Sequence, residues 1–151
     1  TSKEGFAHAN DVSSYSLVLV ARMAKELDML NENASIVTLT YLGSTKVLEG
    51  YNVMGIAKSA LEASVRYLAY NLGKEGIRVN AVSSGPIKTL SAKGIKDFNS
   101  ILSVVEEKAP LHRNVTIEQI GDVATFLLSS MSEAITGQVI FADSGYCIMG
   151  N

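Results

Sequence analysis

Tyr51 and Lys58, which lie seven residues apart, are the side chains in this sequence best suited to chemistry. On a helix, seven steps of about 100° each leave the two side chains about 20° apart on one face. A phenol alone is a weak acid with a pKa near ~10, but a nearby ammonium favours its ionised form, so the pair can donate to a developing oxyanion near neutral pH. Such a donor lowers a reaction barrier by roughly 3 kcal/mol. Gly55, between the two on the same side, would leave room for a ligand.

The same spacing occurs at Tyr67 and Lys74, so the interval alone proves little. This second pair falls in the last turns of the predicted helix, at the opposite edge of the expected sheet, where a half-buried tyrosine and a snorkelling lysine are ordinary. For the first pair, the alternative is an amphipathic helix that Tyr51 begins and on which Lys58 is solvated. Position along the helix, rather than spacing, therefore favours Tyr51 and Lys58 as a functional pair.

Hydrophobic periodicity divides the chain into helices and short strands. We expect one long helix over residues 6–30, with a bend or polar contact in its first part, where Asn10, Asp11 and Ser14 compete for backbone hydrogen bonds. The other expected elements are a strand over residues 34–41, a helix over 51–72 capped by Gly73, a strand over 77–83, a helix around 101–105, a helix with Thr116 as its N-cap, and a strand over 139–142.

A helix of this length between two short apolar strands predicts parallel strands joined by a right-handed crossover. The fold class is therefore α/β, a parallel sheet with helices on both faces, in one domain over residues 1–151. Ligands of such sheets bind outside the carboxyl ends of the strands. These ends are predicted at residues 40–43, 83–86 and 143–145, and the helix that carries Tyr51 and Lys58 starts from the same edge.

Composition excludes several classes of function. The 151 residues carry 13 basic and 15 acidic side chains, a net charge of −2, so a nucleic-acid partner is not expected. No apolar stretch approaches the roughly 20 residues of a membrane-spanning helix, and no signal peptide opens the chain, which predicts a cytoplasmic protein without a membrane partner. Cys147 is the single cysteine, and His8 and His112 are the two histidines, so neither a disulfide nor a Cys/His metal site is expected.

Three segments resemble a known family: Tyr41-Leu42-Gly43, the run YNVMGIAK from Tyr51 to Lys58, and the run RVNAVSSGPIKTL that begins at Arg78. They are similar to bacterial enoyl-acyl carrier protein reductases of the NADH-dependent type, in the short-chain dehydrogenase/reductase superfamily. Other members of that superfamily, including ketoacyl reductases, carry the tyrosine and lysine four residues apart. The resemblance therefore favours reduction of C=C over reduction of C=O. It also implies that the chain forms the carboxyl-terminal part of a Rossmann-like fold.

The resemblance implies three catalytic residues. Tyr51 would hydrogen-bond the thioester carbonyl and stabilise the enolate that forms when hydride reaches the β-carbon. Lys58 would hold the nicotinamide ribose hydroxyls and support that oxyanion electrostatically. Tyr41 would line the substrate pocket close to the nicotinamide.

It also implies two larger sets of contacts. The cofactor-binding residues would be Thr40, Lys58, Gly85, Pro86, Ile87 and Thr89. The substrate-binding residues would be Tyr41, Tyr51, Met54, Ser91, Ala92, Ile95 and Phe98. Ser84 stands where the family usually has alanine, which is a small departure.

The resemblance implies an enoyl thioester on acyl carrier protein as the substrate and NAD(H) as the cofactor, with NADP(H) not excluded. It also implies a homotetramer, whose subunits would pair through helices matching residues 12–30 and 51–72. The family's Gly-rich pyrophosphate loop has no counterpart here, because Gly43, Gly50 and Gly55 lack the dinucleotide-binding spacing. We therefore expect the chain to match the carboxyl-terminal half of such an enzyme, with weak or no catalysis alone. The alternatives are a 3-ketoacyl reductase or alcohol dehydrogenase of the superfamily, and a noncatalytic scaffold.

Overall fold

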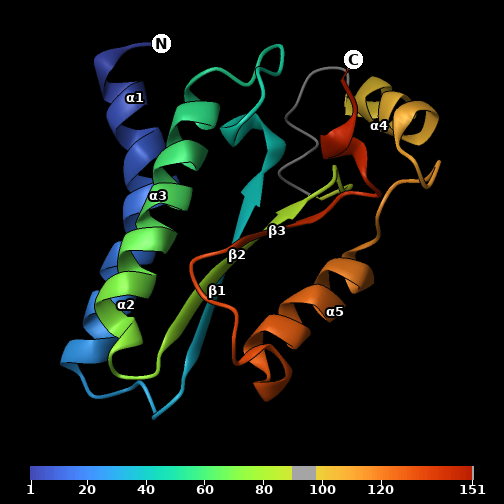
Figure 1. Ribbon diagram of the computed structural model, residues 1–151. Coiled ribbons are helices and arrows are strands. Elements are labelled where there is room, and N and C mark those ends of the chain that lie inside the picture. Colours follow the sequence, from blue (N-terminus) through green and yellow to red (C-terminus); the bar gives the residue numbers. More distant parts are fainter. Residues whose placement is uncertain (90–97, 151) are drawn as a thin grey trace.

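The structure, a computed structural model, describes residues 1–89 and 98–150 (Figure 1). Its elements in chain order are α1 (Lys3–Asn10), the π-helical turn η1 (Asp11–Tyr15), α2 (Ser16–Glu26), β1 (Ser35–Tyr41), the 3-10 turn η2 (Leu42–Ser44), α3 (Val53–Gly73), β2 (Arg78–Ser84), α4 (Phe98–Lys108), α5 (Ile117–Leu128), the 3-10 turn η4 (Ser130–Ser132), β3 (Val139–Ala142) and the 3-10 turn η5 (Tyr146–Ile148).

The strands form a parallel sheet in the order β1-β2-β3, as predicted. In Figure 1, α2 and α3 cover one face of the sheet and α5 covers the other. Alternation along β2 supplies both layers: Val79 and Ala81 pack with Val65 of α3, whereas Val82 packs with Leu127 of α5. The predicted fold class is confirmed.

The first predicted helix is interrupted, and it is shorter than expected at its carboxyl end. The π-helical turn η1 separates α1 from α2, and there the Ser16 hydroxyl donates to the Val12 carbonyl oxygen at 2.7 Å, a local bond of the expected kind. The helix ends at Glu26 rather than at residue 30, because Asp28 adopts a positive φ of 55° that a helix cannot continue.

The start of α3 corrects a prediction that matters for the site. Tyr51 does not begin the helix, because Asn52 has a φ of 44° and α3 begins only at Val53. Tyr51 therefore lies on the turn before the helix, and the 20° separation argued from helical phase does not apply to it. At the other end, Gly73 is the last helical residue and Lys74 is the cap.

A buried arginine joins the start of the sheet to the end of α5. Arg78, 8% exposed, donates from Nη1 to the Leu127 carbonyl oxygen at 2.9 Å and to Ser132 Oγ at 2.8 Å. Its Nη2 donates to the Ser129 carbonyl oxygen at 3.0 Å. The Leu127 and Ser129 carbonyl oxygens lie at the carboxyl end of α5, where intrahelical donors are missing and a cation suits the negative end of the helix dipole. Arg78 thus holds the carboxyl end of α5 at the edge of the sheet where the strands begin, opposite the strand exits.

Candidate active site

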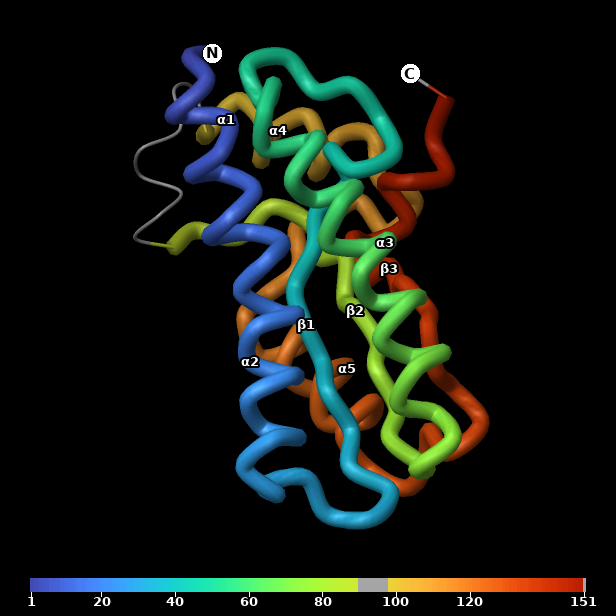
Figure 2. The backbone as a smooth tube through the Cα atoms, turned by 90° about the vertical axis from the view of Figure 1, so that its left-hand side faces the viewer, coloured from blue at the N-terminus to red at the C-terminus, as the bar shows by residue number. Residues whose placement is uncertain are grey.

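The carboxyl ends of the three strands meet at one edge, as the parallel pairing requires. Gly85 follows β2 directly, and a Cβ there would approach Asp143, the residue after β3, to 3.2 Å. The Asp143 carboxylate accepts hydrogen bonds from the amides of Gly145 and Cys147 at 3.0 and 2.8 Å, which fixes the third exit. Figure 2 shows α4, the loop between β1 and α3, and the carboxyl end of the chain at this same end of the molecule.

Two tyrosine rings lie together at the exit of β1. The rings of Tyr41 and Tyr51 meet edge to face, with centroids 5.3 Å apart and an interplanar angle of 63°. Gly43 makes this packing possible, because a Cβ at that position would overlap the Tyr51 ring. Gly55 serves a related purpose: a Cβ there would come within 2.7 Å of the Gly43 carbonyl oxygen. The missing side chain at Gly55 therefore allows the Gly43 backbone to approach α3, and Gly55 also lines the pocket described below.

The phenol of Tyr51 is held in its protonated form. Burial, reinforced by the neighbouring Tyr41, raises the pKa of Tyr51 to about 12. The pKa of Tyr41 is also raised, first by burial and then by Tyr146. We expected the Lys58 ammonium to favour the ionised phenol, and that expectation is wrong for this structure, because burial dominates. Tyr51 therefore suits a hydrogen-bond donor rather than a phenolate base at neutral pH.

Lys58, on the second turn of α3, reaches back to the end of β1. Its Nζ donates to the Leu39 carbonyl oxygen at 3.0 Å. Leu39 precedes Thr40 and Tyr41 directly on β1, so the ammonium lies near the exit of this strand. Burial lowers the pKa of Lys58, and the charge of Glu62 acts in the opposite direction. One of the three ammonium donors is used by Leu39, so the group retains capacity to bind a ligand hydroxyl.

Glu62 is a functional candidate that the sequence analysis missed. It is only 6% exposed, and its Oε1 accepts a hydrogen bond from Thr40 Oγ1 at 2.7 Å. The signal was present in the sequence: residues 58, 62, 65 and 69 follow the spacing of one helical face, so a glutamate stands on a buried stripe. Thr40 is 3% exposed, and its hydroxyl is engaged inside the protein rather than at the open edge.

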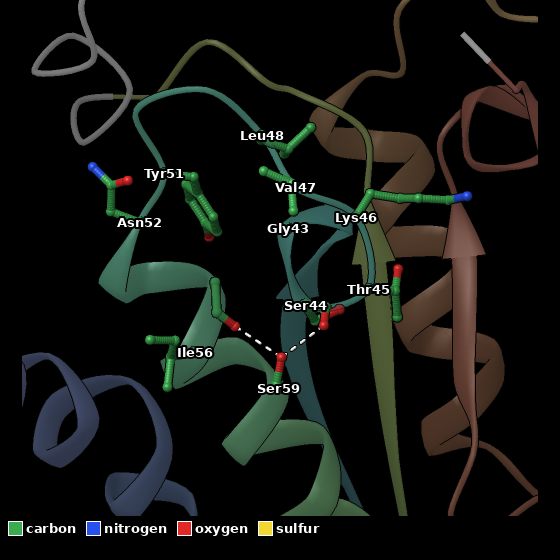
Figure 3. Close-up of a pocket in the computed structure, with 11 residues that line it drawn as sticks. Gly43, Ser44, Thr45, Lys46, Val47, Leu48, Tyr51, Asn52, Ile56 and Ser59 are labelled. Atoms are coloured by element: carbon green, nitrogen blue, oxygen red, sulfur yellow. Dashed lines mark hydrogen bonds between the residues drawn. The ribbon is translucent and has the colours of Figure 1, made fainter.

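A pocket of about 290 Å³ opens beside Tyr51, between the β1–α3 loop and the first turns of α3. Figure 3 shows Ser59 below it, where the Ser59 hydroxyl contacts the carbonyl oxygens of Ser44 and Gly55, at 2.6 and 2.9 Å. The pocket is lined by Gly43, Ser44, Thr45, Lys46, Val47, Leu48, Tyr51, Asn52, Gly55, Ile56 and Ser59. Loop residues 45–48 were not singled out from the sequence, since a polar loop gives no periodic signal.

Comparison with known proteins decides the family. The family model described as enoyl-(acyl carrier protein) reductase matches residues 1–147. The chain belongs to this family. It is 56% identical over 150 residues to an NADH-dependent enoyl-[acyl-carrier-protein] reductase of Bacillus cereus, covering 99% of this chain and 58% of the relative. A relative from Staphylococcus aureus, named as NADPH-dependent, is 55% identical over 97% of this chain and 56% of its own length.

Solved structures of family members agree. The Bacillus cereus enoyl-acyl carrier protein reductase, solved with NADP+ and indole naphthyridinone, superposes with a TM-score of 0.96 at 56% identity, over 100% of this chain and 58% of that one. The Aquifex aeolicus enzyme gives a TM-score of 0.94 at 50% identity, with the same two coverages. The chain thus has the Rossmann-like fold of the enoyl reductase family and spans somewhat more than half the length of these relatives.

The remaining residues that the family resemblance implied are placed as follows. Gly85 and Pro86 are buried, Ile87 is half-buried, and Thr89 is exposed at the exit of β2. Pro86 and Ile87 line a second pocket of about 560 Å³, which α4 and the start of α5 complete.

The implied acyl contacts are spread more widely. Met54 Sδ lies 4.0 Å from Ser13 Oγ on η1, and Phe98 is half-buried as the first residue of α4. Ser91, Ala92 and Ile95 lie outside the described residues.

Several features contribute no chemistry at this edge. Tyr67 is 72% exposed, more than the half-buried ring that was expected, and Lys74 caps the far end of α3, away from the strand exits. His8 and His112 are exposed, and burial raises the pKa of the Cys147 thiol, which makes it less reactive. Within residues 1–89 and 98–150, no group of three or more metal-ligating side chains occurs, and no helix is both long and apolar enough to cross a bilayer.

Proposed function

We propose that this protein acts in the reduction of the trans-2 double bond of an enoyl-acyl carrier protein thioester in fatty-acid synthesis. The observation that carries the proposal is the protonated Tyr51 phenol, beside Tyr41 and at the strand edge that Lys58 also reaches. Membership of the enoyl reductase family supports it. Because the chain spans 58% of the Bacillus cereus relative, the activity is proposed for the protein together with whatever supplies the remaining length.

In this mechanism Tyr51 donates a hydrogen bond to the thioester carbonyl oxygen. When reduction begins, negative charge develops on that oxygen, and a fixed donor in a partly buried site stabilises it more than water would. The raised pKa keeps the proton on the phenol at neutral pH, so the donor does not need a separate protonation step. Tyr41 packs against the ring and limits its movement.

The cofactor is proposed to be NAD(H) or NADP(H), since relatives are named for each of the two. When bound, the reduced nicotinamide would supply the hydride for the β-carbon, and a proton from solvent would complete the reduction at the α-carbon. The donor set at the edge fits a ribose, because the Lys58 ammonium has further donors beyond the one that Leu39 takes. The proposed nicotinamide contacts follow β2 at the same edge: Gly85, Pro86, Ile87 and Thr89. Thr40 would contribute through its backbone, because its side-chain hydroxyl is bonded to Glu62.

Phe98 and Met54 remain proposed acyl contacts, together with Ser91, Ala92 and Ile95. We also propose a homotetramer that works in the cytoplasm. Large apolar side chains on α2 and α3 remain exposed, among them Val20 at 66% and Tyr70 at 84%, which supports burial against further copies of the chain.

The decisive test is oxidation of NADH or NADPH driven by a trans-2-enoyl thioester. With the remaining length present, we expect turnover, and we expect Tyr51→Phe to lower kcat about 10²- to 10³-fold. The control Tyr67→Phe, whose ring is 72% exposed at the far end of α3, should change it little. Turnover of a 3-ketoacyl thioester in place of the enoyl thioester would favour the ketoacyl reductase alternative. Cofactor oxidation that Tyr51→Phe leaves intact would contradict the proposed role of the phenol.

A further inference from the structure

The interface between α3 and the sheet contains one carboxylate that the proposed mechanism does not use. Glu62 lies beside Leu61 and Val65, which are 2% and 0% exposed, and is itself 6% exposed. Burying a carboxylate is unfavourable unless other groups compensate, and apolar residues of similar volume often stabilise such a position at least as well. A glutamate in this layer therefore points to a role beyond packing.

Two hydrogen bonds connect neighbouring residues of β1 to residues one helical turn apart on α3. The Lys58 ammonium donates to the Leu39 carbonyl oxygen at 3.0 Å, and the Thr40 hydroxyl donates to Glu62 Oε1 at 2.7 Å. Lys58 and Glu62 are four residues apart on α3, a spacing that brings two side chains onto neighbouring positions of the helix surface. The carboxylate is thus fixed by β1 next to the lysine that α3 directs to the same strand.

We propose that Glu62 is a positioning residue for Lys58: its buried carboxylate, held by Thr40, attracts the ammonium and keeps it directed to the end of β1. Burial and the charge of Glu62 are the two influences on the pKa of Lys58, and they oppose each other. Without the carboxylate, burial alone would act and favour the neutral amine. An ammonium that lacks this neighbouring carboxylate is held less firmly at the end of β1, where it would meet a ribose hydroxyl or a developing oxyanion.

This inference rests on the proposed function for its consequence in catalysis, but its first test does not need activity. Glu62→Gln keeps an oxygen that accepts from Thr40 and removes the charge, whereas Glu107→Gln removes an exposed carboxylate on α4 as a matched control. Lys58 is titrated by NMR in protein labelled at the lysine ε-carbon, with its resonance assigned by its loss in Lys58→Arg. We expect the pKa of Lys58 to fall by about one unit in Glu62→Gln, the lower end of the effect of a nearby opposite charge, and to stay unchanged in Glu107→Gln.

A second pair of variants tests the same contact from the strand. Thr40→Val removes the hydroxyl that holds the carboxylate, and Thr40→Ser retains it. We expect a smaller fall in the Lys58 pKa for the valine variant and recovery of the native value in the serine variant. If circular dichroism shows that Glu62→Gln does not fold, the two Thr40 variants test the inference in its place.

In the enoyl reduction assay, Glu62→Gln should raise KM for the cofactor several-fold and lower kcat, with a smaller change in KM for the acyl thioester. An unchanged Lys58 pKa in folded Glu62→Gln overturns the inference, as does a fallen pKa with native kinetics for both substrates. A protein that titrates as expected but reduces no enoyl thioester contradicts the proposed function instead, so the two failures are distinguishable.

Discussion

The position of the Tyr51 ring depends on two backbone features rather than on the number of residues between Tyr51 and Lys58. Asn52, with a φ of 44°, ends the loop so that Tyr51 stays on the turn, and Gly43 leaves room for its ring. Residue type and the strand exits singled out Tyr51 and Lys58 from the pattern, and the family resemblance added Tyr41 to the group. Sequence reasoning misjudged the electrostatics, since whether burial or a neighbouring charge controls a phenol depends on packing that no local pattern encodes.

The raised pKa of Tyr51 predicts a loss of stability at high pH. In the unfolded chain the phenol ionises near 10.0, but in the folded protein only near 12. The contribution is therefore fully present below pH 10 and is lost as the pH rises from 10 to about 12, because the unfolded state releases its proton first. Urea unfolding across this range should show a shallower decline for Tyr51→Phe than for the native protein. The control Tyr67→Phe should keep the native slope, and equal slopes for all three proteins would contradict the prediction.

Gly43→Ala should disturb the site without unfolding the protein. The added methyl group would overlap the Tyr51 ring, so the ring must leave its edge-to-face contact with Tyr41. We expect a changed near-ultraviolet circular dichroism spectrum and a loss of enoyl-thioester turnover comparable to that of Tyr51→Phe. Gly73→Ala is the control: a Cβ there meets nothing within 4 Å, and the substitution should be neutral or slightly stabilising. Native spectra and turnover for Gly43→Ala would show that the ring does not need this space.

At the scale of elements, the strands, their parallel order and the bodies of the helices were predictable from hydrophobic periodicity. The capping box at Thr116 was also predictable in part, since its N-cap role follows from residue type, and Gln119 completes it. The π-helical turn η1 was foreseen only as a bend, because polar side chains indicate competition for hydrogen bonds but not the resulting geometry. The early end of α2 and late start of α3 depend on positive-φ residues, Asp28 and Asn52, which residue type alone does not mark as helix ends.

The contact of Arg78 with the end of α5 predicts a large effect on stability. Arg78→Leu would leave the Leu127 carbonyl and the Ser132 hydroxyl buried without this donor, and we expect a loss of about 3 kcal/mol in the free energy of unfolding. Arg66→Leu, at an exposed position on α3, should change it by less than about 0.5 kcal/mol. Chemical denaturation at neutral pH measures both. A similar small change for the two variants would mean that other groups take over the contacts of Arg78.

At the scale of the whole molecule, α2 and α3 present a large amount of apolar surface to solvent. Val20, Leu27, Tyr67 and Tyr70 are each more than 60% exposed, although the interior already holds well-packed layers on both faces of the sheet. Surfaces of this kind on neighbouring helices are typical of contacts between identical subunits.

If the proposed tetramer forms through this surface, charge placed there should dissociate it. We expect the native protein to sediment as a tetramer, and the double variant Val20→Asp with Tyr70→Asp to sediment as a smaller species while keeping its helical circular dichroism signal. Met131→Asp is the control, since this residue is 74% exposed on η4, beyond α5 on the other face. Sedimentation of the native protein as a monomer would contradict the proposed assembly.

The location of Tyr51 on the turn has an evolutionary consequence. Met54 stands four residues before Lys58, the spacing found elsewhere in the superfamily, and its sulfur lies against Ser13 of η1. We therefore expect a tyrosine substituted at position 54 to pack against η1. Passage between the two spacings is thus expected to need a change in the length or course of the loop between β1 and α3, in addition to a substitution in the helix.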